Sequence, residues 1–65
     1  MKISLNGAER TVSAHSMAEL LLELQMPLAG VAVALNGNVV RRAEHQSTLL
    51  KENDEIEIIR AVQGG

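Results

Sequence analysis

Two glycines at the end of the chain are the residues best suited to chemistry. The sequence closes with Val62-Gln63-Gly64-Gly65. Glycine makes up about 7% of residues in proteins, so a closing Gly-Gly pair arises by chance about once in 200 chains. A residue without Cβ lets the backbone pass through a narrow channel and approach a nucleotide closely. The pattern favours an extended tail, residues 62–65, that enters the active site of another protein, over the alternative of a frayed chain end.

The carboxylate of Gly65 is the reactive group of such a tail. It is ionised near neutral pH and is a weak oxygen nucleophile. An enzyme that supplies positive charge lets this carboxylate attack the α-phosphate of ATP, and the acyl-adenylate that forms is open to a sulfur or nitrogen nucleophile. Four extended residues reach at most ~14 Å, so the folded body docks outside the pocket. ATP is therefore expected in the partner enzyme, and no cofactor is expected in this chain.

The side chains suggest no catalytic centre of their own. The two histidines, His15 and His45, are expected at the surface, and no metal-ligand spacing surrounds them. No acid–base pair or cofactor loop is present, so a carrier is favoured over an enzyme. Arg41 and Arg42 are interpreted as a solvated edge, with pairing to acidic residues of a partner as the alternative.

Composition narrows the class of protein further. The chain has 65 residues, no cysteine and no aromatic residue, and its net charge is −2. A single small domain without disulfides follows, and a nucleic-acid binder is disfavoured because aromatic stacking platforms and a basic patch are missing. The longest apolar run, residues 28–35, is too short for a membrane helix. No signal segment is recognised at the start, so a cytoplasmic protein without membrane contact is expected.

The first half of the chain has clear local signals. Alternating apolar residues predict a strand over residues 1–5, and Asn6-Gly7 predicts a hairpin turn into a return strand over residues 8–13. Ser16 and Glu19 form the S-x-x-E signature of a helix start. The helix that follows has one apolar stripe at helical spacing and ends near Pro27. The stripe consists of Met17, Leu20, Leu21 and Leu24.

The second half predicts three more strands. Residues 31–35 alternate in size, Asn36-Gly37 is a second hairpin turn, and residues 38–41 form a short partner strand. Residues 41–47 are expected to be irregular, and residues 48–50 to form a single turn that places a leucine in the core. Asn53 suits the left-handed position of a polar turn. The last strand covers residues 55–62, with Ile56 and Ile58 on one face.

These elements give the order β-β-α-β-β-β in one α+β domain, residues 1–61. One amphipathic helix covers only one face of a mixed sheet of four to five strands, so the other face is left for solvent or a partner. If the last strand is central, four apolar residues gather on that uncovered face, where they are either scattered surface residues or a docking patch that leads to the tail. They are Ile59, Ala61, Ala32 and Ala34.

Several segments together resemble the ThiS family of β-grasp, ubiquitin-like sulfur carriers of thiamine biosynthesis. The resemblance extends over the whole chain, and it depends on the order of the pieces as well as on the closing diglycine. The matching pieces are Met1-Lys2-Ile3, the Ser16–Leu24 helix, Val31-Ala32-Val33-Ala34-Leu35-Asn36-Gly37, Val39-Val40 with Arg42, Asp54-Glu55-Ile56-Glu57-Ile58 and Val62-Gln63-Gly64-Gly65.

The resemblance implies a β-grasp fold and a reaction cycle. An E1-like adenylyltransferase activates the Gly65 carboxylate with ATP. A persulfide donor of the cysteine desulfurase type then replaces AMP with sulfur, and the Gly65 thiocarboxylate supplies that sulfur to thiazole synthase. Two departures from the family pattern, Asn53 in place of glycine and Arg41 in place of proline, leave the tail unaffected.

Other functions fit parts of the same pattern. The small subunit of molybdopterin synthase is a related carrier, although such chains are usually longer and often place prolines before the tail. A ubiquitin-like protein modifier joined through Gly65, or a β-grasp module that only binds, belongs to a different class. Conjugates heavier than the free chain would indicate a modifier, and an oxygen-for-sulfur exchange would indicate a carrier.

Overall fold

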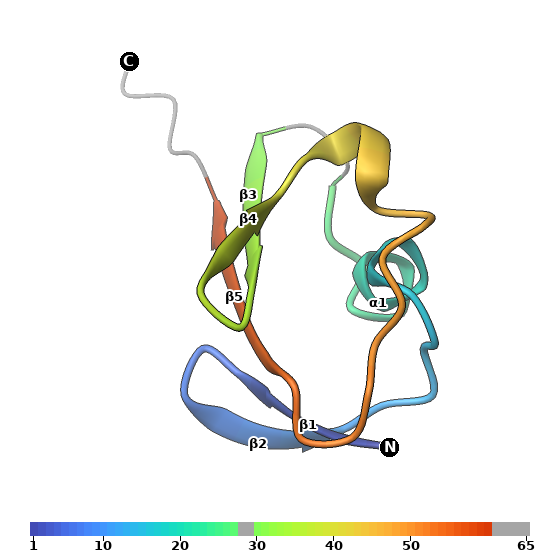
Figure 1. The fold of residues 1–65 in the computed structure, drawn as a ribbon, viewed down its shortest axis with the longest axis vertical. Coiled ribbons are helices and arrows are strands. Elements are labelled where there is room, and N and C mark those ends of the chain that lie inside the picture. Colours follow the sequence, from blue (N-terminus) through green and yellow to red (C-terminus); the bar gives the residue numbers. More distant parts are fainter. Residues whose placement is uncertain (28–29, 61–65) are drawn as a thin grey trace.

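The computed structural model describes residues 1–27 and 30–60, which form a five-stranded sheet with one helix (Figure 1). The predicted order of elements is confirmed, with one short 3-10 helix added. The elements are β1 (Lys2–Leu5), β2 (Ala8–Thr11), α1 (Met17–Glu23), β3 (Val31–Leu35), β4 (Asn38–Val40), η1 (Arg42–Glu44) and β5 (Glu55–Arg60).

The sheet has the strand order β2-β1-β5-β3-β4, so the last strand lies at its centre. Strand β5 pairs in parallel with β1 and antiparallel with β3, which makes the sheet mixed. Both Asn-Gly pairs form the predicted turns, since Asn6, Gly7, Asn36 and Gly37 all have positive φ. The central place of β5 confirms the condition on which the predicted docking patch depends.

Helix α1 begins at the predicted signal. The Ser16 side chain accepts a hydrogen bond from the Glu19 backbone N–H at 3.1 Å. The Glu19 carboxylate reaches back to the N–H of His15 at 2.7 Å, one residue before the position that a regular capping box uses. Side chains therefore satisfy the backbone N–H groups of His15 and Glu19, at the start of α1, where helix geometry provides no partner.

The core lies between α1 and the concave side of the sheet. Met17, Leu20 and Leu21 of the helix stripe are fully buried, and Leu24 packs partly buried at its end. Leu22, which lies off the stripe, is 71% exposed. The sheet and the long connection before β5 contribute the remaining buried apolar residues, which are Ile3, Leu5, Val12, Ala14, Val33, Leu50, Ile56 and Ile58.

The connection between β4 and β5 differs from the prediction in two ways. Residues 41–47 are not wholly irregular, because η1 lies within them. The predicted turn at residues 48–50 is wrong, since Leu49 instead forms an isolated bridge with Ser16 in an extended stretch, although Leu50 does enter the core. The expectation for the polar turn that follows is confirmed, because Asn53 has a φ of 70°.

His45 is the clearest correction, because it is 5% exposed and does not lie at the surface. Its backbone carbonyl accepts a hydrogen bond from the N–H of Ala18, and its own N–H donates to the carbonyl of Arg42. These bonds hold the residue between η1 and the start of α1, where its ring is covered. His15 is exposed, as predicted.

The strand ends also differ from the prediction. Strand β2 ends at Thr11, two residues early, although Val12 still bonds to Met1 and its side chain is buried. Strand β5 is described as far as Arg60. The rest of the predicted last strand and the tail, residues 61–65, lie outside the described residues. The division into a domain and a tail therefore stays a prediction.

Candidate functional site

Strand β5 connects the folded body to the predicted tail. Five register pairs join it to β3, from Leu35 opposite Ile56 to Val31 opposite Arg60. On its other side β1 pairs only with the first part of β5, at Glu55 and Ile56. The end of the strand nearest the tail is thus held mainly by β3.

Two asparagine side chains extend the pairing of β5 beyond the regular ladders. The amide of Asn6 donates to the carbonyl of Ile58 at 3.2 Å and accepts from its N–H at 2.9 Å. The side-chain oxygen of Asn36 accepts from the N–H of Glu55 at 2.9 Å, and its backbone N–H donates to the carbonyl of Glu55. The two hairpin turns therefore fix the central strand from both sides.

Replacing Asn6 with glycine is expected to destabilise the protein by about 1–3 kcal/mol. Glycine tolerates the φ of 51° at this position, so the turn is kept, but both bonds to Ile58 are lost. Urea denaturation measures the change in the free energy of unfolding. Asn6→Asp, which keeps the acceptor and loses the donor, should fall between. A glycine variant as stable as the wild type would show that the bonds to β5 contribute nothing.

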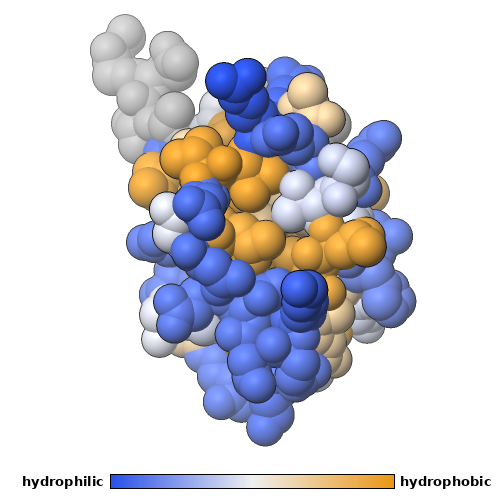
Figure 2. Space-filling model, viewed as in Figure 1, coloured by the Kyte–Doolittle hydropathy of each residue, from blue (hydrophilic) through white to orange (hydrophobic). Residues whose placement is uncertain are grey.

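The face of the sheet opposite α1 carries an exposed apolar group beside β5. Ile59 is 64% exposed and lies opposite Ala32, while Ala34 lies opposite both Glu57 and Val39. A shallow hollow of about 90 Å³ lies among these side chains. Figure 2 shows apolar surface over the region where β3, β4 and β5 lie in Figure 1. We name this group, Ala32, Ala34, Val39 and Ile59, the outer patch.

The outer patch contains three of the four residues predicted for docking. Ala32, Ala34 and Ile59 share one face, whereas Ala61 lies outside the described residues. The prediction did not include Val39, which is 79% exposed and is the residue that β4 contributes to the outer patch. Strand alternation could have identified Val39. Val40 pairs with the buried Val33, and successive side chains of a strand point to opposite faces, so Val39 must lie on the outer face. That inference needs the register of β3 and β4.

The predicted tail contacts lie beyond the described residues. Val62, Gln63, Gly64 and Gly65 all belong to this part of the chain. Within residues 1–27 and 30–60 no three His, Cys, Asp or Glu side chains are close enough to hold a metal ion. In the same ranges no helix has the length and apolar character needed to cross a membrane.

The architecture and the sequence comparisons agree on one class of protein. A five-stranded mixed sheet with one helix on one face is the β-grasp fold, and a strand at its centre leads to the end of the chain. Residues 3–65 match the model of the ThiS family. The chain belongs to the ThiS family, and it is a ThiS-type sulfur carrier.

Individual relatives support this assignment. The sulfur carrier protein ThiS of Thermus thermophilus is 34% identical over 61 residues, which cover 94% of this chain and 95% of that protein. The crystal structure of the thiamine biosynthesis protein ThiS from Geobacter metallireducens superposes with a TM-score of 0.85 at 33% identity and full coverage of both chains. The chain is also 38% identical to a thiazole synthase of Magnetococcus marinus, of which it covers 20%.

Proposed function

We propose that the Gly65 carboxylate is the sulfur-carrying group of this protein. An E1-like enzyme transfers AMP from ATP to the carboxylate and releases pyrophosphate. The outer sulfur of a persulfide then displaces AMP and forms an acyl disulfide between Gly65 and the donor. A second thiol attacks the donor's sulfur and forms a disulfide with it, which breaks the S–S bond of the acyl disulfide and releases the Gly65 thiocarboxylate. Thiazole synthase takes that sulfur for the thiazole ring of thiamine. The chain acts in this cycle as a carrier that enzymes modify, and ATP is bound by the adenylating enzyme.

The family match through residue 65 is the observation that carries this proposal. The match does not stop at the folded body but includes the diglycine end. The fold adds support, because β5 is paired on both sides and runs toward the tail from the centre of the sheet. Another protein that binds such a body brings the Gly65 carboxylate to ATP without a separate encounter, which lowers the entropy cost of the reaction.

Thiazole synthase is supported as a partner by two further relatives. The thiazole synthases of Magnetococcus marinus and Paramagnetospirillum magneticum each contain a segment similar to this whole chain, at 38% and 35% identity. That segment accounts for only 20% of each protein. A carrier-like segment within a polypeptide of that name favours direct delivery of sulfur between the two parts.

Intact mass spectrometry tests the proposed cycle. The protein is incubated with an E1-like adenylating enzyme, ATP and a persulfide donor in the presence of a thiol reductant, and its mass is then measured. Exchange of one oxygen for sulfur, an increase of about 16 Da, is expected when all three components are present. Omission of ATP should prevent the exchange. An unchanged mass in the complete reaction would refute the carrier cycle at Gly65, and a ladder of heavier conjugates would favour a protein modifier.

We further propose that the outer patch is the surface that docks on the adenylating enzyme. Ile59→Glu should weaken this binding by about 100-fold, because a charge is buried against an apolar partner surface without a counter-ion. The fold should remain intact, since Ile59 is exposed and points away from the core. Isothermal titration measures the affinity, and circular dichroism checks the fold.

Leu22→Glu is the matched control for this substitution. Leu22 is also a large exposed apolar residue, but it lies on α1, on the other side of the sheet. The control adds the same charge and should bind normally. If both variants bind as the wild type does, the outer patch is not the docking surface.

A further inference from the structure

Within the described residues, the carboxylates of Glu55 and Glu57 differ from the other acidic side chains in their hydrogen bonding and ion pairing. Six of the eight have a partner in the structure: Glu9 pairs with Lys2, and the other five accept backbone N–H groups. Those five are Glu19, Glu23, Glu44, Glu52 and Asp54. Within the described residues, Glu55 and Glu57 have no side-chain hydrogen bond or ion pair. The structure therefore gives the other acidic side chains an internal role that it does not give to these two.

Both unpaired carboxylates lie on the outer face, next to the outer patch. Glu57 lines the shallow hollow of the patch together with Ile59 and Val39. It also lines a second hollow, of about 500 Å³, which it shares with Glu55. The apolar and the acidic areas are therefore continuous, with Glu57 at their border.

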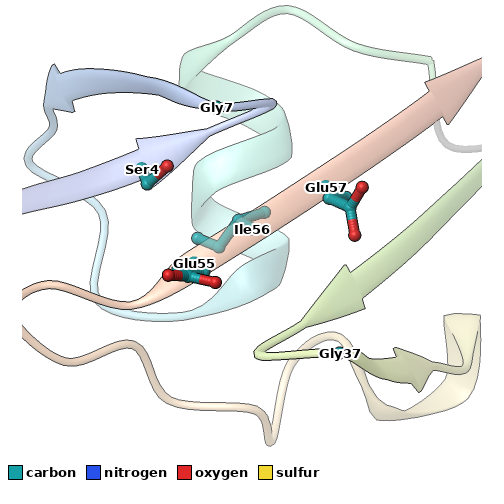
Figure 3. A pocket seen from close by; sticks show the side chains of 6 residues that line it. All are labelled: Ser4, Gly7, Gly37, Glu55, Ile56 and Glu57. Carbon is teal, nitrogen blue, oxygen red and sulfur yellow. The ribbon is translucent and has the colours of Figure 1, made fainter.

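The second hollow lies between the two hairpin turns. Figure 3 shows Glu55 and Glu57 along β5, with Gly7 of one turn and Gly37 of the other on either side. Each of these glycines has open space at the position of a Cβ, so neither position places a side chain in the hollow. A long side chain of a docked protein has room to lie there beside both carboxylates.

The arrangement is unfavourable for the free protein. Two residues apart on one strand, the side chains are about 6.6 Å apart at their bases and on the same face. This separation is below the Debye length of about 8 Å at physiological salt, so the two negative charges repel each other. Among the described residues no cation pairs with either, and a cation supplied from outside would relieve the repulsion.

We propose that the outer face binds a basic side chain of the adenylating enzyme. An arginine or lysine enters the hollow between the hairpin turns and pairs with Glu55 and Glu57, while an apolar side chain covers the outer patch. The two negative charges favour a basic partner surface, because an acidic one would be repelled here. This inference rests on the proposed function for the identity of the partner.

Affinity and its salt dependence test the inference. The double variant E55Q/E57Q keeps the shape of both side chains and removes both charges. Its affinity for the adenylating enzyme should fall by about tenfold or more, and the decline of wild-type affinity with added salt should flatten. Thermal unfolding should occur at the same or a higher temperature, because a repulsive pair has been removed. Loss of binding without loss of stability separates an interface role from a structural one.

E19Q/E23Q is the matched control. It removes two charges from α1, on the opposite side of the sheet, and glutamine still accepts the N–H bonds that these residues accept. This control should bind with wild-type affinity and salt dependence. Equal weakening in the two double variants would overturn the inference, because only net charge would then matter.

Other outcomes separate the inference from the proposed function. If E55Q/E57Q binds like the wild type while Gly65 is still converted to the thiocarboxylate, the inference fails and the proposed function stands. If the loss appears with thiazole synthase and not with the adenylating enzyme, the partner named here is wrong. A wild-type chain that the adenylating enzyme neither binds nor modifies overturns both.

Discussion

A chain that ends at Gly64 is expected to keep its fold and to lose sulfur transfer by at least about 100-fold. Removing Gly65 shortens the tail by about 3.5 Å. The carboxylate then stops short of the α-phosphate, and a misplacement of only about 1 Å can cost 100-fold in rate. The buried core lies between Ile3 and Ile58, so its packing does not involve the deleted residue. Mass spectrometry of the complete reaction measures the thiocarboxylate, and circular dichroism measures the fold.

Gly65→Ala separates the reach of the tail from its width. This variant keeps the length and adds one Cβ, so any loss measures how narrow the partner's channel is. If the tail acts by reach alone, the alanine variant should react nearly normally while the shortened chain does not. A shortened chain that receives sulfur at the wild-type rate would show that the last residue is not the reactive one.

The local elements were predictable because each has a signal within a few residues. Asn-Gly pairs tolerate positive φ at both positions, so Asn6-Gly7 and Asn36-Gly37 set the two hairpins whatever surrounds them. The helix start depends on Ser16 and Glu19, which act within one turn. Helical spacing then selected the buried leucines of α1 correctly.

Features that depend on distant residues were harder to predict. His45 is buried because η1 and the start of α1 meet around it, and no neighbour in the sequence signals that contact. The bonds from Asn6 to Ile58 join residues 52 positions apart. Knowing that an Asn-Gly pair makes a turn gives no information about which strand its amide reaches.

The outer patch lies between these two cases. Alternation along single strands identified Ile59, Ala32 and Ala34, and only the central position of β5 had to be assumed. Predicting Val39 required the register of the sheet. Predicting which acidic residues have a partner required the full set of hydrogen bonds. The contrast between paired and unpaired carboxylates, on which the proposed basic contact depends, exists only in three dimensions.

Replacing Leu20 with alanine is expected to lower the free energy of unfolding by about 2–5 kcal/mol. Leu20 is fully buried in the middle of α1, and its loss leaves a cavity between the helix and the sheet. A domain of this size has a total stability of roughly 3–10 kcal/mol, so this loss is a large fraction of the whole. Urea denaturation followed by circular dichroism measures the change.

Leu22→Ala makes the same chemical change two residues away on the same helix. Leu22 is 71% exposed, so its removal leaves no cavity and should change stability by less than about 0.5 kcal/mol. Since leucine and alanine differ little in helix propensity, the difference between the two variants measures packing against the sheet. Equal losses would mean that helix formation, and not packing, limits stability. The carrier would then depend less on its core than the burial of Leu20 implies.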